Sequence, residues 1–104
     1  MSLARVCAIG DVPEGGVRRF PVAGKLVAVA NLGEAGFRAV DAICSHAHYF
    51  LDEGEVDVED ETIECPKHGS TFDLNTGEPR ALPATTPVGA YVVRTVGDDI
   101  LIEV

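Results

Sequence analysis

Short stretches rich in Val, Ile and aromatic residues alternate with clusters of Gly, Asp and Asn along this chain. β-Branched and aromatic residues favour strands, whereas Gly, Asp and Asn favour the turns that separate strands. The pattern predicts strands at residues 17–20, 26–30, 37–40, 91–96 and 100–104.

Two pairs of these strands are separated by residues suited to tight turns. The sequences Val22-Ala23-Gly24-Lys25 and Val96-Gly97-Asp98-Asp99 supply the Gly and Asp that hairpin turns favour, and they predict two hairpins. No window keeps a helical period over three turns, and six prolines and eleven glycines interrupt the chain too often for long helices. We therefore expect an all-β, mostly antiparallel fold with at most a turn or two of helix.

The middle of the chain differs from its two strand-rich ends. A length of 104 residues predicts one domain, residues 1–104. Within it, residues 42–83 combine paired Cys and His, an acidic run and several turn-forming residues. This composition predicts loops and short strands, and we interpret residues 42–83 as a subdomain.

Composition and charge exclude several classes of protein. Apolar residues at 46% and charged residues at 24% are typical of a folded globular domain. A formal charge of −9 argues against nucleic-acid binding. No apolar run approaches the roughly 18 residues of a membrane span, and the start of the chain does not resemble a signal peptide. We expect a cytoplasmic protein, whose reducing compartment keeps thiols available for metals or catalysis.

An acidic run lies between the two Cys/His stretches described next. It contains eight acidic residues and no basic one: Asp52, Glu53, Glu55, Asp57, Glu59, Asp60, Glu61 and Glu64. Two interpretations stay open, a solvated face that aids solubility and a surface that attracts a basic protein partner.

All three histidines and two of the three cysteines occur in two short stretches, Cys44-Ser45-His46-Ala47-His48 and Cys65-Pro66-Lys67-His68. The one- and two-residue spacers let each loop direct one thiol and one imidazole at the same point, which predicts a metal centre. Zinc accepts two Cys and two His, but zinc fingers usually pair Cys with Cys and His with His. A mixed pair in each loop favours a dinuclear centre, in which one iron takes the thiolates and the other the histidines.

Cys44-Ser45-His46 together with Cys65-Pro66-Lys67-His68-Gly69-Ser70 resembles the cluster-binding loops of the Rieske family. The resemblance implies an antiparallel sandwich with a small subdomain of two loops that bind one [2Fe-2S] cluster. It also implies that Cys44 and Cys65 hold a buried iron and that His46 and His68 hold an outer iron.

Positions beside the ligands refine the resemblance. It implies that Gly69, Ser70, Phe72 and Pro83 surround the cluster, with Ser70 as a hydroxyl donor and Pro83 in a covering segment. High-potential Rieske subunits carry a tyrosine where this chain has Phe72, and a disulfide where it has Tyr49 and Lys67. Fewer donors and acidic surroundings predict a potential in the lower part of the range of about −150 to +300 mV.

These departures resemble the Rieske-type ferredoxins of bacterial multicomponent oxygenases. The resemblance implies a one-electron carrier, not itself an enzyme, between a flavin-dependent ferredoxin reductase and a terminal oxygenase or other acceptor. Residues 60–85 also resemble Rieske ferredoxins found beside iron-sulfur assembly genes, so both settings stay open. Two further alternatives are a structural zinc-binding interaction module and a Rieske subunit fixed in a larger enzyme.

Two residues outside the ligand set have simple interpretations. His48 is interpreted as a polar loop residue beside the cluster, with a proton relay or alternative ligand as the other choice. Cys7 lies in an apolar stretch and is expected in the core, because free cysteine is among the most often buried residue types.

Overall fold

The computed structural model describes residues 2–45, 49–67, 69–82 and 85–104. These residues form strands joined by loops and three single 3-10 turns, at Ile9–Asp11 (η1), Gly33–Ala35 (η2) and Leu51–Glu53 (η3). The strands are β1 Leu3–Ala8, β2 Val17–Val22, β3 Lys25–Asn31, β4 Phe37–Asp41, β5 Val56–Asp57, β6 Thr62–Glu64, β7 Thr71–Asp73, β8 Ala90–Tyr91, β9 Val93–Val96 and β10 Asp99–Glu103. The all-β prediction is confirmed.

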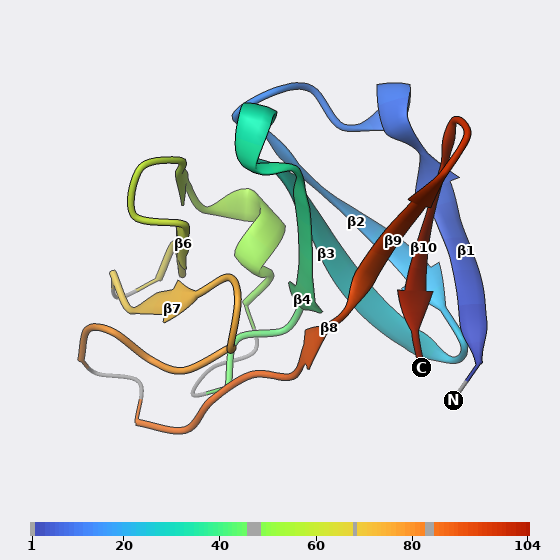
Figure 1. Cartoon of the computed structure of the whole chain (residues 1–104). Coiled ribbons are helices and arrows are strands. Elements are labelled where there is room, and N and C mark those ends of the chain that lie inside the picture. Colours follow the sequence, from blue (N-terminus) through green and yellow to red (C-terminus); the bar gives the residue numbers. More distant parts are fainter. Residues whose placement is uncertain (1, 46–48, 68, 83–84) are drawn as a thin grey trace.

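Two antiparallel sheets form the base of the molecule, in the strand orders β2-β3-β4-β8 and β1-β10-β9 (Figure 1). Both predicted hairpins are present, as β2-β3 and β9-β10. Their turns place Ala23, Gly24 and Gly97 at φ values of 52°, 80° and 60°. Glycine adopts this left-handed region at little cost, which is why the Gly positions mark the turns.

The structure divides the predicted strand at residues 91–96 between the two base sheets. β8 pairs with β4, whereas β9 pairs with β10. Val92, between them, is 51% exposed, and its carbonyl accepts a hydrogen bond from the Glu103 N–H. The chain changes its pairing partner at this residue, and a pattern of side chains does not reveal such a change.

Strand β3 is buried on both faces and separates two apolar cores. Val27 and Val29 face the base core, together with Cys7, Ile100 and Ile102. Ala28 and Ala30 face the opposite way, because successive side chains alternate across a strand. The second core contains Leu32, Val40, Ala42, Cys44, Leu51, Ile63, Cys65, Phe72, Leu74 and Val88 as its other buried members. The small alanine side chains leave room for these larger residues.

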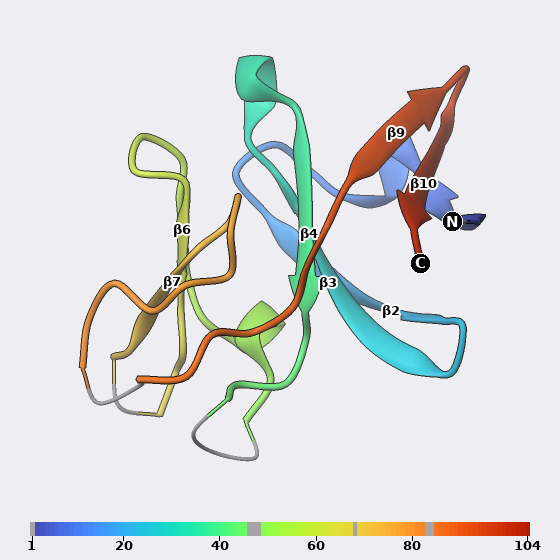
Figure 2. The same ribbon diagram turned by 60° about the horizontal axis from the view of Figure 1, so that its bottom comes forward.

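A third sheet, β5-β6-β7, lies on the far side of β3 and β4 from the strands β1, β9 and β10 (Figures 1 and 2). It falls within residues 42–83, whose limits as a subdomain stay a prediction. Arg38 on β4 joins it to the base. The Arg38 guanidinium donates to Asn75 Oδ1 at 2.7 Å and to Glu61 Oε1 at 3.3 Å.

The N-terminal strand β1 was not predicted, although the core position of Cys7 was. Cys7 is 3% exposed, and burial raises the pKa of its thiol. Strand β1 pairs with β10 at the other end of the sequence. In the described part of the chain, no helix is long and apolar enough to cross a membrane.

Candidate metal centre

The two cysteine-bearing loops are each closed by a backbone hydrogen bond of the same kind. The Cys44 N–H donates to the Tyr49 carbonyl at 2.9 Å, and the Cys65 N–H donates to the Ser70 carbonyl at 2.6 Å. Just outside each closure the flanking residues form antiparallel pairs, Ile43 with Phe50 and Glu64 with Thr71. We call residues 44–49 loop 1 and residues 65–70 loop 2. Each cysteine therefore lies at the base of a hairpin loop that also carries a predicted histidine ligand.

The two cysteines share one apolar core and are not joined to each other. Cys44 is 3% exposed and Cys65 is fully buried, and neither forms a disulfide. Thiolates are soft ligands that suit iron-sulfur clusters, so this pair fits the iron held by cysteine in a Rieske centre. His46, His48 and His68 lie outside the described residues, among which no group of three His, Cys, Asp or Glu side chains is placed to hold a metal ion.

A contact across the loops brings their polypeptides together. The Lys67 Nζ of loop 2 lies 5.4 Å from the centroid of the Tyr49 ring of loop 1. Such a separation is within the range of a cation–π interaction. The contact joins the two positions at which the resembling high-potential proteins carry a disulfide.

Residues predicted to surround the cluster lie in loop 2 and in strand β7. Gly69 has a φ of +76° and its N–H donates to the Cys65 carbonyl at 3.2 Å, which tightens loop 2. Ser70 and Phe72 are fully buried. Phe72 pairs with Ile63 on β6 and forms a bridge with Pro79. The aromatic ring therefore packs into the same core as both cysteines.

The segment between strands β7 and β8 contacts loop 1. The Ser45 hydroxyl, in loop 1, donates to the Thr86 carbonyl at 2.5 Å. The Val88 N–H donates to the Gly77 carbonyl at 2.9 Å, and the Val88 side chain enters the core of the cysteines. Leu82 in this segment is 77% exposed. Pro83, predicted to lie over the cluster, is outside the described residues.

Asp41, three residues before Cys44, fixes the end of this segment and was not singled out from the sequence. Its carboxylate accepts hydrogen bonds from the Tyr91 hydroxyl at 2.5 Å and from the Gly89 N–H at 2.8 Å. Burial, the hydrogen bond to Asp41 and the charge of Asp41 raise the pKa of Tyr91 to about 12. A lone Asp and a distant Tyr carry no sequence pattern that relates them.

Gly54 is a second position missed in the sequence. A Cβ at Gly54 would lie 1.7 Å from the Glu64 carbonyl oxygen, immediately before Cys65. The Glu64 N–H donates to the Glu55 carbonyl at 2.8 Å in the same place. Only glycine lets the two backbones approach so closely, so Gly54 helps to set the position at which loop 2 begins.

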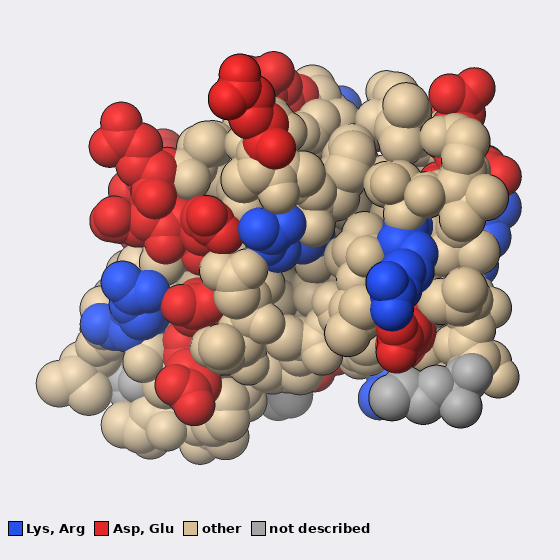
Figure 3. All heavy atoms as spheres, viewed as in Figure 1, with Lys and Arg blue, Asp and Glu red and all other residues tan. Residues whose placement is uncertain are grey.

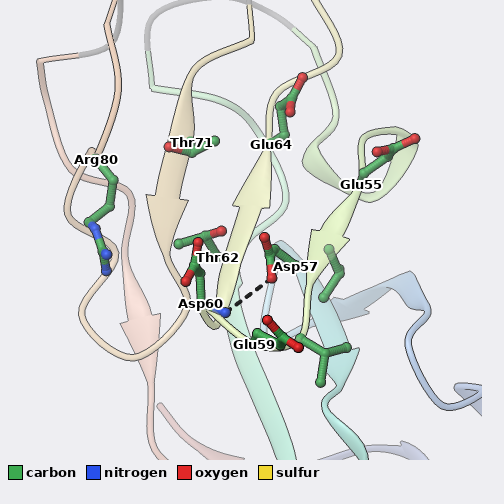
Figure 4. A pocket seen from close by; sticks show the side chains of 10 residues that line it. Glu55, Asp57, Glu59, Asp60, Thr62, Glu64, Thr71 and Arg80 are labelled. Carbon is green, nitrogen blue, oxygen red and sulfur yellow. Dashed lines mark hydrogen bonds between the residues drawn. The ribbon is translucent and has the colours of Figure 1, made fainter.

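Five of the eight acidic residues of the run line an open hollow on the third sheet, and acidic side chains gather on this side of the molecule (Figure 3). The hollow has a volume of about 540 Å³. The Asp60 N–H donates to Asp57 Oδ1 at 3.0 Å and Arg80 stands on the opposite wall (Figure 4). Its lining is Glu55, Val56, Asp57, Val58, Glu59, Asp60, Thr62, Glu64, Thr71 and Arg80.

Comparison with known proteins gives concordant results. A family model described as the Rieske [2Fe-2S] domain matches residues 2–95. The ferredoxin component of biphenyl 2,3-dioxygenase from Rhodococcus jostii is 38% identical over 103 residues, which cover 99% of this chain and 94% of that protein.

Solved structures include two similar ferredoxins. The ferredoxin of carbazole 1,9a-dioxygenase from Nocardioides aromaticivorans has a TM-score of 0.91 and 37% identity, covering 98% of this chain and 97% of that one. A chain in a complex of reduced oxygenase and oxidized ferredoxin in carbazole 1,9a-dioxygenase has a TM-score of 0.85 and 34% identity, covering 96% of this chain and 91% of that one.

Proposed function

The chain belongs to the Rieske [2Fe-2S] domain family, and we propose that it carries single electrons from a flavin-dependent ferredoxin reductase to a terminal oxygenase. It is a ferredoxin with a Rieske-type [2Fe-2S] cluster, an electron-transfer component and not itself an enzyme. The observation that carries the proposal is the pair of buried cysteines, Cys44 and Cys65, which form no disulfide and lie at the bases of two matched loops.

We propose that Cys44 and Cys65 hold one iron of the cluster and that His46 and His68 hold the other. The cluster supplies a site that gains and loses one electron. The chain contributes an apolar core around both thiolates. This core limits the access of water, and solvent exposure is one of the properties that set the potential of such a cluster.

The environment of the cluster supports a low potential within the family. Gly69, Ser70, Phe72 and Pro83 are proposed to surround it. Phe72 has no hydroxyl to donate, and the chain has a formal charge of −9, which disfavours a further negative charge on reduction. We therefore propose a potential in the lower part of the range of about −150 to +300 mV.

The relatives favour the oxygenase setting over iron-sulfur assembly. Those described above are named as ferredoxins of biphenyl and carbazole dioxygenases, and one structure is a complex with an oxygenase. A cytoplasmic location and a single domain with a cluster-binding subdomain at residues 42–83 belong to the same proposal. None of the three cysteines forms a disulfide, which supports a reducing compartment.

The test is the visible absorption and low-temperature EPR spectrum of anaerobically purified protein, before and after dithionite, with iron, sulfide and zinc content. Two irons and two sulfides, with the low-average-g signal of a mixed Cys/His cluster on reduction, are expected. Cys65→Ser should abolish this signal, whereas Cys7→Ala, which removes the buried thiol of the base core, should keep it. A colourless protein with one zinc would refute the electron-carrier proposal and support the alternative of a structural zinc-binding interaction module.

The direction of electron transfer is tested separately with the cluster in place. The NADH-dependent flavin reductase of a dioxygenase system should bleach the oxidised protein in catalytic amounts, and a terminal oxygenase should reoxidise it. Failure of every such reductase to reduce a chemically reducible cluster would refute the proposed donor and leave the cofactor unaffected.

A further inference from the structure

We propose that Lys67 and Tyr49 form a non-covalent clasp that holds the two cysteine-bearing loops together and slows release of the cluster. The inference rests on the proposed function, because it assigns these two residues a role toward the cluster that the loops bind. They are positioning residues, which act through the loops that they join.

The two residues belong to different loops, and each loop has a fixed base. Tyr49 ends loop 1, where its carbonyl accepts the Cys44 N–H. Lys67 lies inside loop 2, which the bond from the Cys65 N–H to the Ser70 carbonyl closes. The distance of 5.4 Å from the Lys67 Nζ to the ring centroid therefore connects two segments between which the described residues form no strand pairing.

Neighbouring contacts hold both sides of the clasp in place. Phe50, next to Tyr49, lies under the guanidinium of Arg19 from strand β2, with 3.6 Å between the Arg19 Cζ and the ring centroid. On the other side, Lys67 follows Pro66, whose ring fixes the φ angle of residue 66 itself. The Pro66 ring lies against Gly54, where a Cβ would be 3.3 Å from the Pro66 Cδ. The residues next to Tyr49 and Lys67 are therefore held in place by contacts with other parts of the chain.

The partner of Lys67 is notable in a chain with 17 acidic residues. Among the described residues, five ion pairs connect arginines to carboxylates, and none of them includes Lys67. An ammonium over the face of a tyrosine is attracted by the negative potential of the ring. The contact is therefore directed at loop 1 and not at the nearby acidic run.

The expected strength of the contact between Lys67 and Tyr49 follows from the solvent exposure of the two side chains. Lys67 is exposed and Tyr49 is 39% exposed, so the contact belongs to the weaker, solvated cation–π class. Contacts of this class change an equilibrium or a rate by about two- to five-fold. A clasp of this strength leaves the cluster able to form without it and changes how long the cluster is retained.

A double-mutant cycle on the holoprotein tests the clasp. Tyr49→Leu, Lys67→Met and the double variant are purified anaerobically, and the loss of visible absorbance is followed in excess EDTA. Each single variant should lose its cluster about two- to five-fold faster than the parent. The double variant should lose it no faster than the faster single variant, because the two changes remove the same contact.

Conservative variants and a matched control separate the clasp from other effects. Tyr49→Phe keeps the ring and Lys67→Arg keeps the cation, so both should retain nearly the parent rate. Lys25→Met removes the other lysine of the chain, whose Nζ lies 6.0 Å from the Tyr91 ring in the base, and should have no effect. EDTA is anionic, so removing the positive charge of Lys67 would by itself slow the reaction of EDTA with the cluster. A faster loss of the cluster in Lys67→Met is therefore not explained by the change in charge.

Additive effects in the double variant, or Tyr49→Phe as fast as Tyr49→Leu, would overturn the clasp while the proposed function stands. A parent protein without iron and sulfide would overturn the proposed function, and the clasp with it. Iron and sulfide analysis of the parent, made before the cycle, distinguishes these two failures.

Discussion

Gly54 shows how a single backbone contact can control the second cysteine loop. A Cβ at this position would lie 1.7 Å from the Glu64 carbonyl oxygen, which is backbone and cannot rotate away. Gly54→Ala must therefore displace the end of strand β6, next to Cys65. We expect a loss of about 1–3 kcal/mol in the free energy of unfolding, as for other overpacked sites. We also expect less iron and sulfide per chain, measured together with urea unfolding.

Gly10→Ala is the matched control, because a Cβ there would meet nothing within 4 Å. It should keep the parent stability and cluster content. Equal effects of the two substitutions would show that the close approach at Gly54 has no special role.

At the scale of residues, the sequence suggests which residues are the proposed ligands, but it does not reveal the residues that support their loops. Cys44 and Cys65 were identified because a thiol and an imidazole at short spacing have few other uses. Gly54 carries no such chemistry, since its importance comes from a backbone that returns beside it ten residues later. The contact of Lys67 with Tyr49 likewise depends on how the two loops face each other.

The joint between strands β4 and β8 gives a pH-dependent prediction at the scale of elements. The Tyr91 hydroxyl of β8 donates to the Asp41 carboxylate at the end of β4. Burial, this hydrogen bond and the charge of Asp41 raise the pKa of Tyr91 from 10 to about 12 in the folded protein. The unfolded chain ionises Tyr91 first. Its contribution to stability is therefore complete below pH 10 and is lost as the pH rises from 10 to about 12.

Urea unfolding followed by circular dichroism at pH 8, 10 and 11.5 measures this effect. Tyr91→Phe should be less stable than the parent at pH 8 by about 1.5–3 kcal/mol, the usual range for a hydrogen bond to a charged group. The difference should shrink at pH 11.5. Tyr49→Phe is the control, because the other tyrosine of the chain makes no hydrogen bond to Asp41. A difference that stays constant across this range would refute the assignment.

Elements with local partners were predictable, and elements with distant partners were not. The hairpins β2-β3 and β9-β10 followed from their turn residues, because each strand pairs with its neighbour in sequence. Strand β1 has its partner, β10, at the opposite end of the chain, and its alternation is broken by a shift in register between Arg5 and Cys7. The division of residues 91–96 into β8 and β9 likewise depends on two different sheets.

At the scale of the whole molecule, charge is distributed unevenly around the three layers. The acidic run includes strands β5 and β6, and five of its eight acidic side chains line the open hollow on the third sheet. Loop 2 begins directly after β6, so the second cysteine lies next to the sheet that carries the acidic hollow. This arrangement supports the interpretation of the acidic run as a surface that attracts basic partners, beside its contribution to solubility.

Ionic strength distinguishes these two interpretations of the acidic run. Reduced protein is mixed with a basic cytochrome c, a probe of known charge, and the second-order rate of electron transfer is measured by stopped flow. If the hollow attracts basic proteins, the rate should fall steeply as salt rises, because charges separated by more than about 10 Å are largely screened at 0.1 M. Glu55→Gln with Glu59→Gln should lower the rate at low salt and flatten its salt dependence.

The control removes two charges outside the hollow, in Glu34→Gln with Asp98→Asn, and has the same change in net charge. A steering role for the hollow requires the first pair to have the larger effect. Equal effects of the two pairs would mean that net charge alone sets the rate. A rate independent of salt would leave the acidic run as a solvated face, because electrostatic attraction that reaches across solvent is always weakened by ions.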